Sequence, residues 1–229
     1  MFPITRWTLI QQVNDETRTD SRLALEELCQ QYAQPVLAFV QRRVSSRQEA
    51  EDVTQEFFAQ LINGQLLSKA DPNRGTFRAF LLNAVRNFIS DSNDRRQAIK
   101  RGGHANHVSL QVTDGLDARE VTAEQAFELQ WVRATLAAAL QELEHEYREA
   151  GKSDIFDALK SALDDSARVT AAQVGQSLKM TESAVRVCLH RMRKRLGQLI
   201  RRHIQNTVEK ADQVDDEIRS LMQLLESNR

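Results

Sequence analysis

Apolar residues recur every three or four positions along most of this chain, which is the spacing of amphipathic helices. Glycine and proline, which interrupt helices, number only eight and three among 229 residues. The pattern therefore predicts an all-α fold. The expected helical segments are Glu49 to Ile62, Phe77 to Asp91, Thr122 to about Ala150, Ser153 to about Leu163, Thr170 to Leu178, Thr181 to Arg202 and a last helix within Val208 to Arg229.

The helical pattern falls into two blocks, which we interpret as two domains covering residues 1–98 and 122–206. Between them, 99–121 contains paired glycines and polar residues without sustained periodicity, which predicts a flexible linker. The remaining residues, 207–229, have apolar positions at near-helical spacing among acids. They predict an amphipathic C-terminal extension that needs a surface to pack on.

The segment Glu49 to Ile62 predicts an amphipathic helix with a polar side. Its apolar stripe consists of Val53, Phe57 and Leu61, with Phe58 and Ile62 beside it. Three polar residues fall together on the opposite side: Asp52, Gln55 and Glu56. The acids could be read as a metal-binding cluster, but helical spacing spreads Glu49 and Glu51 around the helix and no histidine is near in sequence. A charged protein-binding face is the interpretation we favour.

The segment Phe77 to Asp91 has an unusual polar side for a structural helix. Its expected buried residues are Phe77, Leu81, Ala84, Val85 and Phe88. The polar side consists of Asn83, Arg86, Asn87 and Ser90, next to Phe80, and a basic stretch with Arg95 and Arg96 follows. Amides and Arg hydrogen-bond to base edges, aromatic rings stack on unpaired bases, and Arg neutralises phosphates. The pattern suits a single nucleic-acid strand, and an ordinary solvated face is the alternative.

The region from Thr170 to Arg202 has the pattern of a helix-turn-helix. Thr170 and Gln173 have capping-box spacing, the helix they start ends near Leu178, and a three-residue break follows. The second helix, Thr181 to Arg202, carries seven Arg and Lys against a single acid. So much local positive charge indicates a phosphate-binding surface, with a solvated basic helix as the alternative.

Composition excludes several other classes of protein. The formal net charge is −1 at pH 7, and no apolar run approaches the roughly 20 residues that cross a bilayer. Cys29 and Cys188 are far apart in sequence, which favours a reduced, metal-free, cytoplasmic protein without cofactor. None of the common nucleotide-binding, zinc-protease or serine-hydrolase motifs is present, so we expect no enzymatic activity.

Three separated motifs resemble those of the extracytoplasmic-function (ECF) sigma factors of bacterial RNA polymerase. EAEDVTQEFFAQL is similar to the helix of that family that docks on the polymerase clamp. FRAFLLNAVRNFISD is similar to its promoter-melting helix, and AAQVGQSLKMTESAVRVCLHRMRKRL to its C-terminal helix-turn-helix. The three motifs occur in the family's order, and the resemblance that rests on them extends over almost the whole chain.

The resemblance implies a role for each motif. The first domain would bind the clamp of the largest polymerase subunit through Asp52, Gln55 and Glu56, and would melt the −10 element. The −10 contacts would be Phe80, Asn83, Arg86, Asn87, Arg95 and Arg96, with Asn87 in the pocket for a flipped base. The second domain would contact the flap of the second-largest subunit and the −35 element. The −35 contacts would be Thr181, Ser183, Arg186, Val187, His190, Arg191, Arg193 and Lys194.

The chain departs from the family pattern at three positions of the helix-turn-helix. Lys179 stands where a turn glycine is common, and a left-handed lysine there costs about 1 kcal/mol. Gly175 replaces the usual alanine, which would permit closer packing of the two helices. Cys188 replaces a frequent arginine, so no base contact is carried over to it.

The ADPNRG and AIKRGG sequences and the extended C-terminus resemble those of a subgroup of these factors found in planctomycetes and relatives. An anti-sigma factor or a protein Ser/Thr kinase would be the regulator implied by the resemblance, with Thr54 as a target of the kinase. The extension would inhibit the factor by folding back, support the second domain, or bind a partner.

Three functional hypotheses follow. The first is a sigma factor, monomeric when free and not bound to a membrane, that directs core polymerase to promoter DNA. The second is a stand-alone helix-turn-helix regulator, which would dimerise and would not use the polar side of Phe77 to Asp91. The third is an adaptor that binds polymerase without directing transcription.

Overall fold

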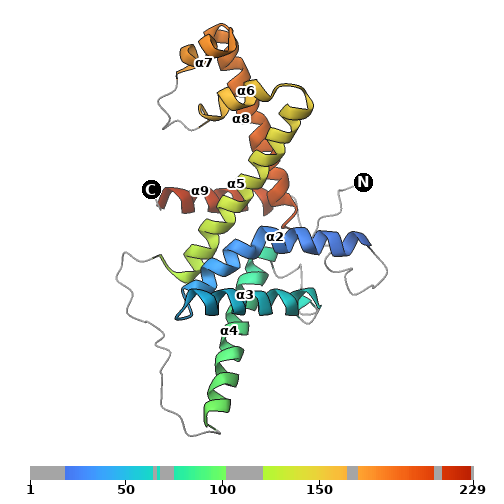
Figure 1. Ribbon diagram of the computed structural model, residues 1–229, viewed down its shortest axis with the longest axis vertical. Helices are drawn as coiled ribbons and strands as arrows, with labels where there is room; N and C mark the ends of the chain where they lie inside the picture. The colour runs from blue at the N-terminus through green and yellow to red at the C-terminus, as the bar shows by residue number, and fades with distance from the viewer. Residues whose placement is uncertain are drawn as a thin grey trace. The chain divides into compact units, whose positions relative to one another are not determined.

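The computed structural model describes residues 19–63, 66–67, 75–101, 121–163, 170–208 and 213–227. These residues form α-helices joined by turns, without strands, which confirms the predicted fold class for the part of the chain described (Figure 1). The helices are α2 (Thr19–Gln41), α3 (Arg47–Ile62), α4 (Phe77–Arg101), α5 (Ala123–Glu149), α6 (Ser153–Lys160), α7 (Ala171–Leu178), α8 (Glu182–Gln205) and α9 (Gln213–Ser227).

The chain divides into two compact units. The first unit comprises Met1–Ala134 and Gln205–Arg229, and the second comprises Thr135–Ile204. The division therefore falls inside α5 and near the end of α8, whereas the domain boundaries predicted from the sequence were 98, 122 and 206. Of the predicted linker 99–121, residues 99–101 continue α4 and 102–120 lie outside the described residues.

The core of the first unit is rich in aromatic rings. Phe57 of α3 and Phe88 of α4 meet edge to face with ring centroids 5.6 Å apart. Tyr32 of α2 lies edge to face against Phe77, at 5.4 Å, and stacks on Phe127 of α5 at 6.4 Å. Burying such rings accounts for much of the stability of a small helical unit. The apolar faces predicted for 49–62 and 77–91 are thus the ones that the unit buries, with Ala84 half-buried.

Side-chain hydrogen bonds cap two of the predicted helices. The Thr122 hydroxyl accepts a hydrogen bond from the Gln125 amide at 3.1 Å, and the Thr122 amide donates to the Gln125 side chain at 2.9 Å. The expected capping box at Thr170 also forms. The helix predicted from Ser153 begins at that residue as α6, but Ser153 does not cap it, because Lys152 holds the cap position without a side-chain hydrogen bond.

A largely buried arginine, Arg78, joins three helices of the first unit. Arg78 of α4 forms ion pairs with Glu128 of α5 and, at 2.7 Å, with Glu217 of α9. The guanidinium also lies 4.7 Å from the centroid of the Trp131 ring. The side chains of Arg78 and Glu217 are only 12% and 10% exposed.

The C-terminal extension packs as the sequence predicted for an amphipathic helix. Val214 and Leu221 of α9 are buried, and the Phe77 amide that begins α4 donates to the Thr207 carbonyl at 3.1 Å. Through these contacts and Glu217, α9 is part of the first unit. Packing against the first unit was not one of the three roles predicted for the extension.

The second unit packs α6, α7 and α8 against the later half of α5. Its buried residues are Ala139, Leu143, Phe156, Leu159, Val174, Val185, Met192 and Leu199. Leu189, Leu196 and Ile200 are partly buried around them. The apolar stripe predicted for 181–202 is therefore the face of α8 that covers this core.

The turn between α7 and α8 shows both departures noted in the sequence. Lys179 closes α7 in the left-handed conformation, with φ 53° and ψ 40°. Gly175 of α7 lies so close to the next turn that a Cβ placed on it would be 2.7 Å from the Met180 carbonyl oxygen. The replacement of alanine by glycine therefore permits the close packing that the sequence predicted.

Lys179→Gly is expected to stabilise the second unit by about 1 kcal/mol, because glycine adopts the left-handed conformation without the Cβ penalty. Urea unfolding followed by circular dichroism measures the change. Lys179→Ala is the control, since alanine keeps the Cβ and should give no comparable gain. An equal gain in both variants would mean that the lysine side chain, not the backbone, is the source of strain.

Candidate protein-binding and nucleic-acid-binding surfaces

The polar side of α3 is exposed as predicted. Asp52, Gln55 and Glu56 are all exposed, while Val53 and Phe57 on the other side are buried. The helix begins at a regular cap, where the Ser46 hydroxyl accepts from the Glu49 amide at 3.1 Å. A rigid helix thus presents a carboxylate-rich surface suited to a basic partner.

An apolar residue adjoins this surface at the end of α3. Ile62 is 47% exposed, and Phe58 is half-buried beside Phe57 with ring centroids 5.4 Å apart. Protein interfaces combine apolar anchors with a polar rim, so an exposed isoleucine next to acids fits a protein-binding face. The sequence pattern placed Ile62 beside the apolar stripe without showing that the core leaves it uncovered.

The acids of α3 do not gather into a metal site. Glu51 pairs instead with Arg47 at 2.8 Å, one helical turn away. Within the described ranges, no group of three or more His, Cys, Asp or Glu side chains is placed to hold a metal ion.

The polar side of α4 is exposed at the positions predicted to meet a nucleic-acid strand. Asn83, Arg86 and Asn87 are exposed. Phe80 is half-buried, because its ring packs against Phe77 at 5.9 Å. The Arg86 guanidinium donates to the Asn83 carboxamide oxygen at 3.2 Å, which holds these two side chains together. The side chains of Arg95 and Arg96 lie outside the described residues.

Arg86 has a further partner that the sequence did not reveal. Its guanidinium lies 3.1 Å from a carboxylate oxygen of Glu124, in the first turn of α5. Arg43, just after α2, contacts the same oxygen at 2.9 Å. These residues are separated by 38 and 81 positions in sequence, so no local pattern could have indicated the contact.

The residues predicted to face DNA on α8 lie on its exposed side. Exposed positions include all eight predicted −35 contacts: Thr181, Ser183, Arg186, Val187, His190, Arg191, Arg193 and Lys194. Two of them already have local partners, since Arg186 pairs with Glu182 and the Thr181 hydroxyl accepts from the Ala184 amide at 3.2 Å. Arg193 donates to the carbonyl of Ala162, just after α6, at 3.2 Å.

Three basic residues later in α8 pair with acids of α5. Arg195 pairs with Glu146 at 2.6 Å, and Arg202 and His203 both pair with Glu142. The hydrogen bond from Arg195 is the main reason why the pKa of the Glu146 carboxyl is lowered. These ion pairs attach α8 to α5, so Arg195 and Arg202 have partners within the unit.

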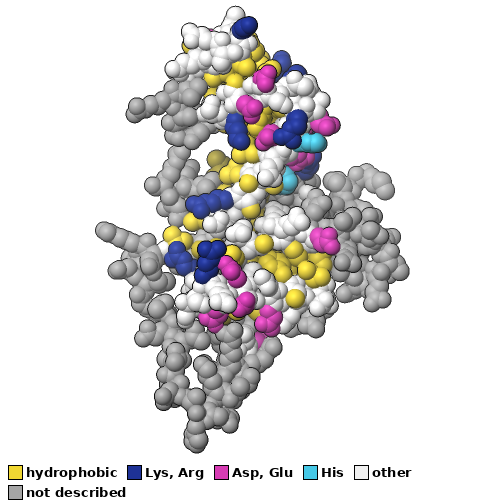
Figure 2. Space-filling model, in the orientation of Figure 1, with side chains coloured by type: hydrophobic (Ala, Val, Ile, Leu, Met, Phe, Trp, Pro, Cys, Tyr) yellow, Lys and Arg dark blue, Asp and Glu magenta, His cyan; other side chains and the backbone are white. Residues whose placement is uncertain are grey.

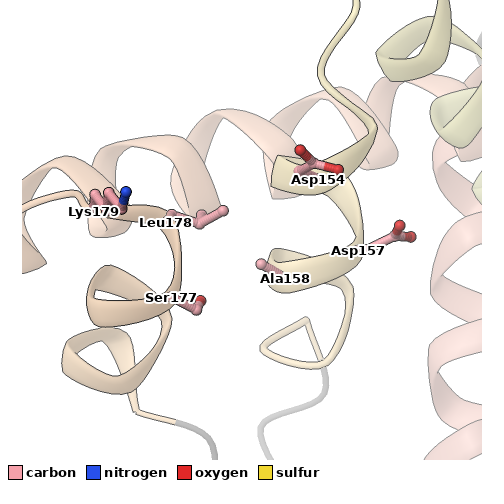
Figure 3. Close-up of a pocket in the computed structure, with 6 residues that line it drawn as sticks. All are labelled: Asp154, Asp157, Ala158, Ser177, Leu178 and Lys179. Carbon is pink, nitrogen blue, oxygen red and sulfur yellow. The ribbon is translucent and has the colours of Figure 1, made fainter.

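An open hollow of the second unit lies between α6 and α7 (Figure 3). It is lined by Asp154, Asp157, Ala158, Ser177, Leu178 and Lys179. Figure 3 shows the Asp157 side chain turned away from α7, so the acids do not converge on one point. The hollow has no constellation of catalytic groups, and its lysine is the strained residue of the turn.

The exposed Asn and Arg side chains of α4, the exposed cations of α8 and the acidic side of α3 have the chemistry expected of a protein that binds nucleic acid and a protein partner. Comparison with known proteins narrows the class. Residues 28–99, about a third of the chain, match the family model of sigma-70 region 2. This match contains all of α3 and nearly all of α4.

The chain is also similar to the ECF RNA polymerase sigma factor SigE of Mycolicibacterium smegmatis. The two are 26% identical over 186 residues, which is 81% of this chain and 65% of that protein. The chain therefore matches slightly less than two thirds of the length of this relative. No solved structure matches the chain. Both similarities are to sigma factors, one to their region 2 and the other over most of this chain.

No helix in the described part of the chain is long and apolar enough to span a membrane.

Proposed function

We propose that this protein is a sigma factor of the ECF type that binds core RNA polymerase and directs it to promoter DNA. The observation that carries the proposal is the pair of exposed surfaces on α3 and α4. Both lie within the segment that matches sigma-70 region 2, and both show the residue chemistry that their predicted roles require.

The polymerase contact of the proposal is the acidic side of α3. Asp52, Gln55 and Glu56 would meet the coiled-coil clamp of the largest subunit, and Ile62 would add an apolar contact at the edge. Exposed carboxylates on a rigid helix accelerate encounter with a basic surface and fix its register.

The −10 contact of the proposal is the polar side of α4. Asn83 and Asn87 offer donors and acceptors to a base turned out of the stack, and Phe80 lies beside them with its ring partly exposed. Arg86 would hold the backbone, followed by Arg95 and Arg96. Turning out a base costs a few kcal/mol, which amide and aromatic contacts offset.

The −35 contact of the proposal is the exposed side of α8. Near its start, Ser183, Arg186 and Val187 are exposed and would contact bases in the major groove, as the first residues of a recognition helix do. Arg191 and Lys194 would bind phosphates. The flap of the second-largest polymerase subunit would be the protein partner of the second unit.

The regulatory part of the proposal needs one change from the sequence-based expectation. A cytoplasmic monomer controlled by an anti-sigma factor or a Ser/Thr kinase, in the planctomycete-type subgroup with a C-terminal extension, remains the proposal. Thr54, however, is buried in α3 against the core. A kinase would reach its hydroxyl only after α3 left the core, so Thr54 is not proposed as the phosphorylated residue.

Asp52→Arg is expected to abolish co-elution with bacterial core RNA polymerase on size exclusion, because it places a cation where the clamp requires an acid. The change corresponds to at least a roughly tenfold loss of affinity. Asp157→Arg is the matched control, since it makes the same charge change at an exposed helical position of the second unit. Co-elution of the Asp52→Arg variant, or none with the unaltered protein, would contradict the proposed function.

A further inference from the structure

Two arginines of the first unit converge on one carboxylate oxygen. The guanidinium groups of Arg43 and Arg86 lie 2.9 Å and 3.1 Å from the same Oε1 atom of Glu124. The three side chains come from the turn after α2, from α4 and from the first turn of α5. They are 38%, 47% and 33% exposed, so the cluster is open to solvent. Figure 2 shows basic and acidic side chains adjoining over the start of α5.

The segment that carries Glu124 is attached to the same place by a second bond. Arg42, next to Arg43 in sequence, donates to the Val121 carbonyl at 3.0 Å. The capping box of Thr122 and Gln125 fixes the backbone between Val121 and Glu124. Within the first unit, the beginning of α5 is therefore attached to the turn after α2 by two successive arginines and to α4 by Arg86.

The geometry is that of an anion site whose occupant belongs to the chain itself. Two guanidinium groups aimed at one oxygen match the charge and the forked donors that bind phosphate. Burial by itself would raise the pKa of the Glu124 carboxyl. Hydrogen bonds from its own backbone amide and from Arg86, with the charges of Arg43 and Arg86, hold that pKa below its usual value. The carboxylate is thus charged at neutral pH.

The site adjoins the surface assigned to the −10 strand. Arg86 also donates to Asn83, so one guanidinium touches both the Glu124 carboxylate and an amide of the proposed base-contacting set. A strand lying on this side of α4 would bring its phosphates to the position that Glu124 occupies.

We propose that Arg43 and Arg86 form a binding site for a backbone phosphate of a nucleic-acid strand, and that Glu124 fills this site in the free protein. The strand must displace the start of α5 to bind. The choice of a nucleic-acid phosphate as ligand rests on the proposed function. Arg43 becomes a DNA-contacting residue that neither the sequence pattern nor the family resemblance had indicated.

The test measures binding of the full-length protein to a fluorescein-labelled, mixed-sequence DNA single strand of about 20 nucleotides, by anisotropy at several salt concentrations. Glu124→Gln is expected to bind roughly three- to tenfold more tightly at low salt, because the competing carboxylate is removed and the side-chain shape is kept. Glu144→Gln is the matched control: it removes the same charge from α5 and breaks the Arg148 ion pair, away from the site.

Arg43→Ala is tested in the otherwise unaltered protein and in the Glu124→Gln variant. Arg43→Ala is expected to weaken binding little by itself, because Glu124 already occupies the guanidinium, and to remove the gain when combined with Glu124→Gln. The slope of log affinity against log salt should steepen in Glu124→Gln by about 0.7 for each phosphate newly contacted. Glu124→Asp retains the charge on a shorter side chain, and an intermediate gain is expected.

Equal affinities for Glu124→Gln and Glu144→Gln, or a gain that persists after Arg43→Ala, would overturn the inference. Thermal unfolding of each variant by circular dichroism shows that the compared proteins are folded. If all variants bind the DNA strand with the same affinity while the protein still co-elutes with polymerase, the phosphate site is wrong and the sigma-factor function stands. If Glu124→Gln binds more tightly while polymerase is never bound, the phosphate site stands and the sigma-factor function fails.

Discussion

Arg78→Leu is expected to lower the free energy of unfolding of the first unit by about 3–5 kcal/mol, since removing one partner of a buried ion pair leaves uncompensated charge. Here two carboxylates, Glu128 and Glu217, would lose their common cation and face each other. Urea unfolding followed by tryptophan fluorescence, with Trp7 replaced by Phe so that the signal comes from Trp131, measures the effect locally, because the Trp131 ring lies 4.7 Å from the guanidinium.

Three further variants separate charge from packing at this site. Glu217→Gln should cost much less than Arg78→Leu, because the pair between Arg78 and Glu128 remains. Adding Glu128→Gln and Glu217→Gln to Arg78→Leu should recover most of the lost stability, since neutral residues replace the unpaired carboxylates. Arg47→Leu removes a fully exposed cation paired with Glu51 and should have little effect. If Arg47→Leu and Arg78→Leu had equal effects, the ion cluster would not stabilise the unit.

The cluster also assigns a role to the C-terminal helix. Glu217 brings the acidic helix α9 to the cation of α4, and Val214 and Leu221 bury its apolar side. The extension thus stabilises the first unit, the one that contains the segment matching sigma-70 region 2.

Gly175→Ala is expected to destabilise the second unit by about 1–3 kcal/mol, because the new Cβ would be 2.7 Å from the Met180 carbonyl oxygen. The neighbouring atom is backbone, so relief requires the turn between α7 and α8 to move. We expect DNA binding by the second unit to weaken as well, since the start of α8 follows that turn. Circular dichroism during urea unfolding measures the stability.

Gly197→Ala supplies the matched control within the same unit. Gly197 lies in α8, and nothing approaches the position of its missing Cβ within 4 Å. Alanine there should stabilise the helix by about 0.5–1 kcal/mol, because glycine has the poorer helix propensity. The same substitution is therefore expected to act with opposite sign at two helical positions. A stabilising effect of Gly175→Ala would contradict the close approach of the two helices.

The positions and buried faces of the helices could be predicted because they depend on local periodicity. Val53 and Phe57 share a side of α3, and Val185 and Met192 share a side of α8, because a helix repeats every 3.6 residues wherever it is placed. The capping box at Thr170 is determined by residues three positions apart. The exposed sets on α3, α4 and α8 follow from the same rule, since the side away from the core is left to solvent.

The pairing of charges could not be predicted, because each pair joins residues far apart in sequence. Arg195 looked like one more phosphate-binding cation until the fold brought it to Glu146. Nothing in the sequence indicated that Arg78 is largely buried or that Arg43 contacts Glu124. The sequence by itself determined which residues are helical and which sides are polar. Only the tertiary structure decided which cations are neutralised by the chain and which remain for a phosphate, because that depends on how the helices pack.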